Sequence, residues 1–382
     1  MIKVLYANPE RHDYMHSTLL EGLSARSDIE LWCLNEGNYG ARATMCFRGD
    51  HQAALRRVDD ADVVVIGTES KRSDLGLGAR TVLGASKTPR QRWVLVDSGD
   101  LGSLPPIPIS WNRFDAVLKR ELYLPSRRAR VLVGNLLGRR VRRPVEYQFR
   151  SHPLLPFPNV QCNALARPAA VSFKRRGFAL PPGVHMRCEP IGVEQRLVQT
   201  FNDSPQRSVT CTLAANIEPR RRILSHLAGR ASVLVEQVPR DASDPVDLVA
   251  LGAVSPRRVG DHVHSSAYLA WLNKHRASIS FPGAGFDTAR FWEILASGSL
   301  LISKRISLDL PVPLRDGVEY VGYDSLAELN VAIDFALGDS PEVNAIRRRG
   351  YRTAIDSYSS RAIADRFTKF EIRGTERQAG DS

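Results

Sequence analysis

The sequence lacks several features that would assign it quickly to a class of protein. It has five cysteines, an odd number, widely spaced and without a C-x-x-C pair: Cys33, Cys46, Cys162, Cys188 and Cys211. Neither a disulfide framework nor a cysteine zinc site is therefore predicted. No apolar run is long enough to cross a bilayer or to act as a signal peptide. We expect reduced thiols in a soluble, cytoplasmic protein.

Lysine is scarce relative to arginine, with 8 Lys and 45 Arg among 382 residues. The formal net charge of +12 is compatible with nucleic acid, an anionic membrane surface, an acidic substrate or a phosphorylated ligand. Codon usage in a GC-rich genome would explain the arginine bias equally well. The densest basic run, residues 127–150, alternates arginine clusters with apolar residues, and we interpret it as a solvated surface that can face a membrane.

What is present is enough apolar side chain for two globular domains, since 43% of the residues are hydrophobic and 25% are charged. Buried-looking strands alternate with helical periodicity in each half of the chain, which favours parallel sheets with helices on both faces. Among these elements are the predicted strands at 2–7, 29–34 and 299–305 and the predicted helices at 265–276 and 326–337. The predicted fold class is α/β, with two Rossmann-like lobes facing across a cleft. The predicted domains are an acceptor lobe at 1–190, a donor lobe at 191–345, and a C-terminal helix and tail at 346–382.

The stretch "FPGAGFDTARFWEILASG" joins a predicted strand to a predicted helix. Gly283 and Gly285 allow a ligand to approach the backbone closely. The helix start supplies unpaired N–H groups and the positive end of a dipole, which suit a phosphate. Asp287 or Thr288 can cap the helix. The pattern lacks the lysine of a P-loop and the third glycine of a dinucleotide fingerprint, so neither nucleotide hydrolysis nor dinucleotide chemistry is indicated.

Arg290 and Glu293 lie three positions apart on this predicted helix and therefore on neighbouring parts of its surface. Arg290 can make bidentate contacts to a diphosphate, and the Glu293 carboxylate can accept both hydroxyl hydrogens of a ribose. An ordinary ion pair between the two residues, with no ligand, is the alternative reading.

The segment "SSAYLAWLNKHRASISFPGAGFDTARFWEILASGSLLIS" resembles the donor site of GT-B glycosyltransferases, in particular the bacterial spore-maturation-type and exostosin-like branch. The resemblance spans about residues 265–335. It implies two Rossmann-like lobes, with the nucleotide-sugar held mainly by the C-terminal lobe and the acceptor by the N-terminal lobe. It implies that Glu293 holds the nucleotide ribose, that Arg290 meets the diphosphate, and that Gly283, Gly285 and the backbone near Asp287 line the sugar and phosphates.

The same resemblance implies a second donor loop at "AANIEPRRR", which makes Asn216, Arg220 and Arg221 secondary candidates; a surface cluster at a helix start is the alternative. The chain departs from the family at Gly285, where many retaining members have another glutamate. Inversion and retention of the sugar configuration both stay open.

An inverting transfer needs a general base near the acceptor hydroxyl. Asp97 and Asp100 in "VDSGD", together with His12, follow predicted strands of the first lobe and are the candidates. Turn formation by Asp and Gly is the ordinary alternative. His262 and His264 have an alternate spacing, but no cysteine or carboxylate pattern completes a site around them, so no metal is expected.

These observations predict a metal-independent glycosyltransferase that moves a sugar from a nucleotide-sugar to an acceptor of a cell-surface polysaccharide, glycolipid or secondary metabolite. We expect no cofactor, a glycan, lipid-linked or small-molecule acceptor, and peripheral contact with the anionic inner face of a membrane. Two alternatives remain: a non-catalytic glycosyltransferase-like scaffold that binds nucleotide or glycan, and a basic nucleic-acid-binding protein.

Overall fold

The structure is a computed structural model of residues 1–382. It describes residues 1–7, 13–34, 45–47, 50–68, 77–99, 113–122, 184–213, 223, 225–227, 230, 233–237, 266–282 and 286–373.

The chain divides into two compact units. The first contains residues 1–192, 307–311 and 360–382, and the second contains residues 193–306 and 312–359. The helix Pro341–Tyr358 belongs to the second unit, and the helix Ser360–Phe367 belongs to the first. The predicted lobe boundaries and the predicted acceptor and donor roles stay predictions.

The first unit is built on a parallel sheet. Among the described residues its strand order is β3-β2-β1-β4-β5-β6-β7. The strands are β1 (Ile2–Ala7), β2 (Ile29–Leu34), β3 (Met45–Cys46), β4 (Val63–Gly67), β5 (Arg92–Asp97), β6 (Ala116–Lys119) and β7 (His185–Cys188). β1, β4 and β5 are nearly continuous runs of buried residues, as expected for strands covered on both faces.

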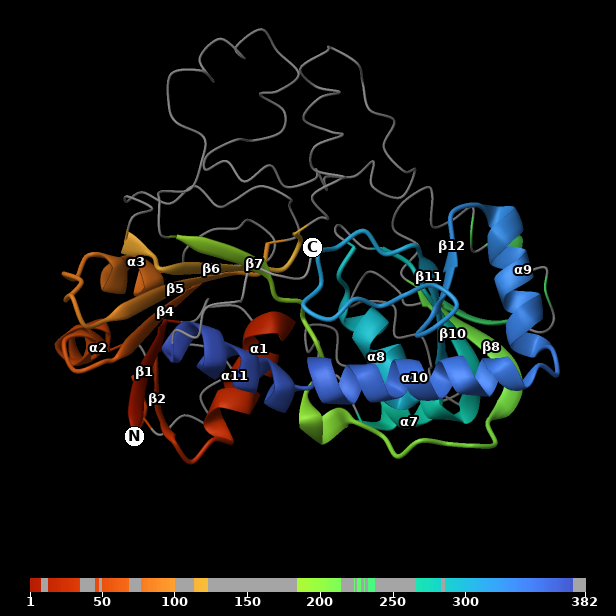
Figure 1. Cartoon of the computed structure of the whole chain (residues 1–382), viewed down its shortest axis with the longest axis horizontal. Coiled ribbons are helices and arrows are strands. Elements are labelled where there is room, and N and C mark those ends of the chain that lie inside the picture. Colours follow the sequence, from red (N-terminus) through yellow and green to blue (C-terminus); the bar gives the residue numbers. More distant parts are fainter. Residues whose placement is uncertain are drawn as a thin grey trace, which may run out of the picture. The chain divides into compact units, whose positions relative to one another are not determined.

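The helices of the first unit are α1 (Tyr14–Ser24), α2 (His51–Val58), α3 (Leu77–Leu83) and α11 (Ser360–Phe367), followed by the π-helical turn η6 (Thr368–Ile372). Asp13 caps α1, because its carboxylate accepts from the N–H groups of Met15 and His16. α11 returns from the far end of the chain to pack against α1 (Figure 1). The contact is close, since a Cβ on Gly22 would lie 2.0 Å from the Ser360 carbonyl oxygen.

The second unit has its own parallel sheet, with the described strands in the order β12-β11-β10-β8-β9. They are β8 (Gln206–Leu213), β9 (Val233–Gln237), β10 (His275–Ser280), β11 (Leu300–Lys304) and β12 (Val321–Tyr323). The short 3-10 turn η5 (Gln195–Leu197) precedes them. Because all neighbours pair in parallel, the carboxyl ends of these strands share one edge.

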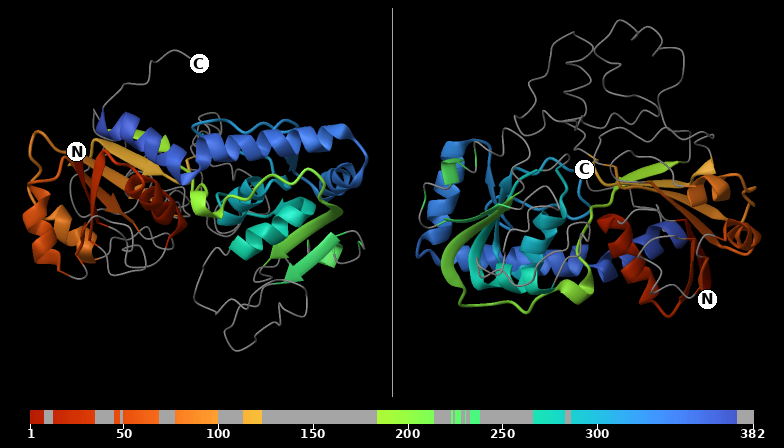
Figure 2. Two further views of the ribbon diagram at one scale, coloured as in Figure 1. Left: turned by 90° about the horizontal axis from the view of Figure 1, so that it is seen from below. Right: turned by 180° about the vertical axis from the view of Figure 1, so that it is seen from behind.

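Helices α7 (Ser266–Lys274), α8 (Ala289–Ser297), α9 (Leu326–Leu337) and α10 (Pro341–Tyr358) surround this second sheet (Figures 1 and 2). α9 buries Leu329, Ala332 and Ile333 in the apolar core that the strands form. α8 is buried from Phe291 to Ser297. It ends at Gly298, whose φ of 78° is the left-handed conformation that glycine adopts most readily.

No helix in the described part of the chain combines the length and the apolar character needed to span a membrane.

Candidate functional site

The predicted donor site lies at the junction of β10 and α8 in the second unit. β10 ends at Ser280, and the buried Phe281 and Pro282 continue from it. α8 starts after Thr288, whose φ of −118° and ψ of 148° are typical of an N-cap. The first N–H groups of α8 therefore lie beyond the carboxyl end of β10, the strand that precedes it. That edge is where ligands bind in open parallel sheets.

The two residues predicted as possible caps of α8 have different positions and partners in the structure. Asp287 is 1% exposed, and its Oδ1 accepts a hydrogen bond from Trp292 Nε1 at 2.5 Å. Thr288 occupies the N-cap position, but its side chain makes no capping hydrogen bond. Its Oγ1 is buried and has no hydrogen-bond partner among the described residues. A buried hydroxyl without a partner costs free energy, and a ligand hydroxyl or phosphate oxygen at this position would make the hydrogen bond that none of the described residues makes.

Arg290 lies in the first turn of α8 and points toward α7. Its Nε donates to Tyr268 Oη at 3.1 Å, and the guanidinium carbon lies 6.0 Å from the Tyr268 ring centroid. Burial alone would lower the pKa of Arg290, but Tyr268 and Glu293 outweigh it, so the pKa is raised above its ordinary value. The guanidinium is therefore a permanent positive charge beside the start of the helix.

Glu293 lies one turn further along α8 and is only 4% exposed, with Trp292 and Ile294 on either side in the sequence. Its charge is close enough to Arg290 to raise the pKa of the guanidinium. The structure thus brings together the two side chains that the sequence singled out. The role of Glu293 as a ribose ligand stays a prediction.

Sequence reasoning missed a positive pair on the neighbouring strand. Lys304 is the last residue of β11, which pairs directly with β10, and Arg305 follows it. The Lys304 ammonium lies 5.1 Å from the Tyr323 ring centroid and donates to the Asp324 carbonyl oxygen at 2.5 Å. The signal was present in the "SKR" that ends this predicted strand. Lys304, at the carboxyl end of a central strand, adds positive charge to the edge that holds the start of α8.

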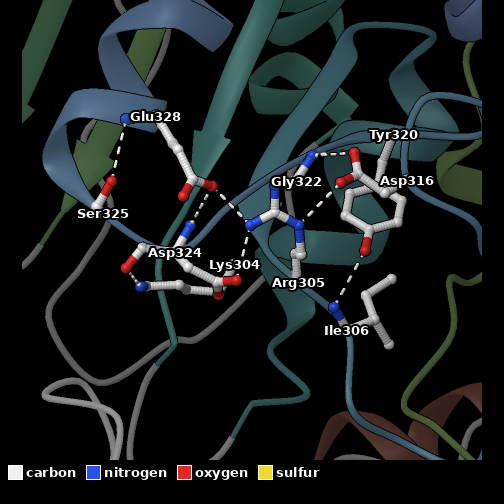
Figure 3. Close-up of polar contacts among 9 residues, drawn as sticks. All are labelled: Lys304, Arg305, Ile306, Asp316, Tyr320, Gly322, Asp324, Ser325 and Glu328. Carbon is white, nitrogen blue, oxygen red and sulfur yellow. Dashed lines mark hydrogen bonds and ion pairs between the residues drawn. The ribbon is translucent and has the colours of Figure 1, made fainter.

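Arg305 joins the ends of β11 and β12 to the start of α9 (Figure 3). Its Nε bonds to Asp316 Oδ2 at 3.0 Å, while Nη1 bonds to Asp324 Oδ2 at 2.7 Å and to Glu328 Oε2 at 2.6 Å. Hydrogen bonds with Asp324 and Glu328 raise the pKa of Arg305. The hydrogen bond with Arg305 lowers the pKa of Glu328. Arg305 thus ties the ends of β11 and β12 to the start of α9 through its three carboxylate partners. Lys304, which still belongs to β11, lies nearer to β10 in strand register.

In the first unit, the predicted base Asp97 ends β5 in a fully buried ion pair. Lys119 Nζ, at the end of β6, lies 2.7 Å from Asp97 Oδ2, and both side chains are 0% exposed. Asp97 Oδ1 accepts from Thr68 Oγ1 at 2.9 Å and from the Gly99 N–H at 3.0 Å. Lys119 also donates to the Gly99 carbonyl oxygen at 3.1 Å. The pair therefore holds the backbone that precedes Asp100, and a proton acceptor role for Asp97 would require it to give up Lys119.

A second buried chain of hydrogen bonds lies at the same edge of the first sheet. His16 on α1 contacts Tyr6 Oη through Nδ1 at 2.8 Å and the Thr68 carbonyl oxygen through Nε2 at 3.0 Å. A carbonyl oxygen can only accept, so Nε2 carries the hydrogen and, in the neutral ring, Nδ1 accepts from the Tyr6 hydroxyl. Burial lowers the pKa of His16 and raises that of Tyr6. The candidate base that the sequence indicated was His12. The histidine in this chain of hydrogen bonds is His16, which lies on α1.

Seven of the predicted site residues lie outside the described residues: His12, Asp100, Asn216, Arg220, Arg221, Gly283 and Gly285. The same holds for His262 and His264. Their predicted roles stay predictions. In the described part of the chain, no group of three or more His, Cys, Asp or Glu side chains is arranged to hold a metal ion.

Comparison with known proteins gives one family and a common fold. Residues 220–369 match the model of a family described as glycosyl transferase-like. No curated protein gives a significant match. Among solved structures, Alr3699/HepE of Anabaena, in complex with UDP and glucose, has 11% identity and a TM-score of 0.50, covering 97% of this chain and 99% of that one.

A DNA-modifying β-glucosyltransferase, studied with and without uridine diphosphoglucose, has 11% identity and a TM-score of 0.49, covering 96% of this chain and 99% of its own. A putative UDP-N-acetylglucosamine 2-epimerase of Listeria monocytogenes has 10% identity and a TM-score of 0.42, covering 98% of each chain. The predicted fold of two Rossmann-like parallel-sheet domains is confirmed. The predicted glycosyltransferase is confirmed as a domain within residues 220–369, while the spore-maturation-type and exostosin-like branch stays a prediction.

Proposed function

We propose that this chain transfers a sugar from a nucleotide-sugar donor, bound at the junction of β10 and α8, to an acceptor hydroxyl. The observation that carries the proposal is the pairing of half-buried Arg290 with buried Glu293 on α8, inside the segment that matches the glycosyl transferase-like family. Fold alone would not support it, because one fold serves many activities.

The donor is held by its two polar parts. The diphosphate lies at the start of α8, where the helix presents the positive end of its dipole and Arg290 carries a permanent charge. Thr288 Oγ1, which lacks a partner among the described residues, donates to a phosphate oxygen. Glu293 accepts from the ribose hydroxyls. Gly283, Gly285, Asn216, Arg220 and Arg221 complete this donor site as the sequence predicts.

The chemistry follows from these positions. As the bond between the sugar C1 and the diphosphate breaks, negative charge grows on the leaving oxygen. Well-placed donors such as the helix N-terminus and Arg290 stabilise that charge by about 3 kcal/mol each. The acceptor hydroxyl must lose its proton, and in an inverting reaction Asp100 or His12 of the first unit would take it, with Asp97 and Lys119 fixing the backbone before Asp100. No cofactor is part of this proposal.

The acceptor belongs to a cell-surface polysaccharide, glycolipid or secondary metabolite. The net charge of +12 would attract a lipid-linked acceptor, or the chain itself, to the anionic inner face of a membrane. Uridine diphosphate is the first nucleotide to test, because the Anabaena neighbour was solved with UDP and glucose.

The test is calorimetric titration of the full chain with the diphosphates of uridine, guanosine, thymidine, adenosine and cytidine and with their sugars. Glu293→Gln keeps the shape of the side chain and removes its charge. We expect one nucleotide to bind, and Glu293→Gln to weaken it about tenfold or more, because a hydrogen bond to a charged group contributes about 1.5–3 kcal/mol. Glu342→Gln, which changes an exposed carboxylate in the first turn of α10, is the matched control and should bind normally.

Release of the nucleoside diphosphate from the bound donor is then followed over time, alone and with a panel of sugar acceptors. Release that disappears in Glu293→Gln supports transfer. Tight binding without release from any donor would favour the non-catalytic scaffold. Failure of every nucleotide to bind the folded wild-type chain would overturn the donor site.

A further inference from the structure

Cys33 and Cys46 lie side by side on neighbouring parallel strands of the first unit. We propose that they form a reversible disulfide, so that this edge of the sheet is a redox-modification site for small-molecule disulfides of the glutathione type. The inference rests on strand register and exposure in the first unit and is independent of the proposed sugar transfer.

The register places the two residues directly opposite each other. β2 pairs with β3 so that Cys33 is the partner of Cys46, and the Phe47 N–H donates to the Cys33 carbonyl oxygen at 2.8 Å. Register partners on parallel strands project from the same face, with their Cα atoms about 4.8 Å apart. That separation lies within the range of about 4.4–6.8 Å found across disulfides. The Cα separation of the pair is therefore compatible with a disulfide.

The neighbouring strand β1 also indicates that Cys33 and Cys46 project from the same face of the sheet. Tyr6 of β1 is the register partner of Cys33, so Tyr6, Cys33 and Cys46 form one row across three strands. Tyr6 reaches His16 on α1, which identifies this face as the one that α1 covers. Cys33 acts on Tyr6 closely enough to raise the pKa of the phenol, although burial contributes more.

The two thiols differ in access, which sets the order of reaction. Both are present as thiols, with Cys33 buried and Cys46 half-buried in the two-residue edge strand β3. A small disulfide therefore reaches Cys46 first. The buried neighbour then acts as the resolving thiol, a common arrangement in redox-sensitive pairs.

The reaction balances as two thiol–disulfide exchanges. The Cys46 thiolate attacks one sulfur of oxidised glutathione, forming a mixed disulfide and releasing one glutathione thiolate, which takes up a proton. The Cys33 thiolate then attacks the Cys46 sulfur, forming the protein disulfide and releasing the second glutathione. Two protein thiols lose two electrons and two protons, and one oxidised glutathione becomes two reduced molecules.

The geometry also explains why this bond would be labile. Cβ atoms of register partners on parallel strands stay near the strand spacing of about 4.8 Å, whereas a relaxed disulfide has Cβ atoms about 3.8 Å apart. The short edge strand must move inward by roughly 1 Å, so the bond carries strain. Strained disulfides are reduced readily, which fits a reversible modification.

The experiment uses the reduced full chain, incubated with oxidised glutathione, blocked with N-ethylmaleimide and digested with trypsin. Cleavage after Arg26, Arg42 and Arg48 separates the two cysteines into peptides 27–42 and 43–48, each with one cysteine. We expect these peptides to be joined through Cys33 and Cys46, the intact chain to lose 2 mass units before it is blocked, and dithiothreitol to restore both thiols.

The variants test the order of reaction. Cys33→Ser should accumulate the Cys46–glutathione adduct, and Cys46→Ser should give no cross-link. Cys188→Ser is the matched control, because it alters a buried cysteine on β7 that pairs in register with Lys119 and should leave the cross-link unchanged. The proposal fails if the wild-type chain accumulates only the Cys46 adduct, links either cysteine to a different one, or remains fully reduced under conditions that oxidise a model dithiol.

Discussion

His16 is a buried histidine whose protonation state follows from its partners. Its ring is 0% exposed, donates to the Thr68 carbonyl oxygen and accepts from the Tyr6 hydroxyl. A protonated ring would turn Nδ1 into a donor and force the Tyr6 hydroxyl to accept instead. Burial also removes the water that would solvate the charge. The neutral ring is therefore part of what stabilises the first unit.

The lowered pKa of His16 predicts that the first unit loses stability in acid. The pKa of His16 is lowered by burial, so above its unfolded value of about 6.5 both states are neutral and its contribution is fully present. As the pH falls below that value, the unfolded chain takes up a proton that the folded chain refuses, and stability is lost. His16→Gln should flatten the fall in melting temperature between pH 7.5 and 5. His275, whose pKa is also lowered by burial, leaves a residual slope, and an unchanged slope would contradict a neutral His16.

The Asp97–Lys119 pair predicts strong coupling between two substitutions. Removing one partner of a buried ion pair leaves an uncompensated charge and costs about 3–5 kcal/mol. Lys119→Met and Asp97→Asn should each destabilise the fold by that order, since both side chains are 0% exposed. The double variant should cost clearly less than the sum. Urea unfolding of all four proteins measures this, and additive losses would show that the pair is not a unit.

At this scale the sequence located single residues but not their partners. Asp97 stood out because it follows a buried strand, yet nothing in the sequence joined it to Lys119, which is 22 positions away and is brought beside it by the pairing of β5 with β6. Arg290 and Glu293 could be paired from the sequence because helical periodicity relates them locally. Tyr268, from another helix, could not.

At the scale of elements, Gly298 ends α8 and fixes how the helix turns into β11. Its φ is 78°, and a Cβ there would lie 2.9 Å from Phe201 Cδ2. The Phe201 ring cannot yield easily, because Arg347 and Arg348 lie over it at 5.0 and 4.8 Å from its centroid. Gly298→Ala therefore combines backbone strain with a steric clash.

Gly317 provides the matched comparison, because its φ is 75° but a Cβ would meet nothing within 4 Å. Gly317→Ala should cost only the strain of a left-handed residue, about 1 kcal/mol. Gly298→Ala should cost at least about 1 kcal/mol more, since an overpacked side chain adds to the strain. Denaturant unfolding of the two variants measures the difference. Equal losses would mean that Phe201 moves aside freely.

Element prediction succeeded where periodicity was long and failed where strands were short. The strands at 2–7 and 29–34 and the helix at 326–337 match β1, β2 and α9 residue for residue. β6, β7 and β12, of four, four and three residues, were not predicted as strands, because they hold too few alternations to show a period. The predicted helix at 265–276 overran by two residues, since α7 passes directly into β10 at His275.

At the scale of the whole molecule, the sequence predicted the two-domain α/β organisation because each half repeats the alternation of strand and helix. It could not predict that the chain returns to the first unit after Ser359. Long-range ion pairs accompany that return, such as Arg366 Nη2 with Glu189 Oε1 at 2.5 Å and Arg187 Nη2 with Glu371 Oε1 at 3.2 Å. Charged residues in such a segment are ordinarily expected to be solvated, so the sequence gives no indication that Arg366 and Glu371 pack against the first unit.

The net charge of +12 predicts general attraction to polyanions, which must be separated from recognition at α8. Association through unpaired surface charges releases counterions and therefore weakens steeply with salt. A single-stranded oligonucleotide should bind in 50 mM NaCl and lose at least about tenfold in affinity by 200 mM, as measured by fluorescence anisotropy. Glu293→Gln should leave this binding unchanged, because Glu293 is 4% exposed and contributes little to the surface. Oligonucleotide binding that resists salt and depends on Glu293 would instead make nucleic acid a specific ligand of the α8 site, and would revive the alternative that the composition alone leaves open.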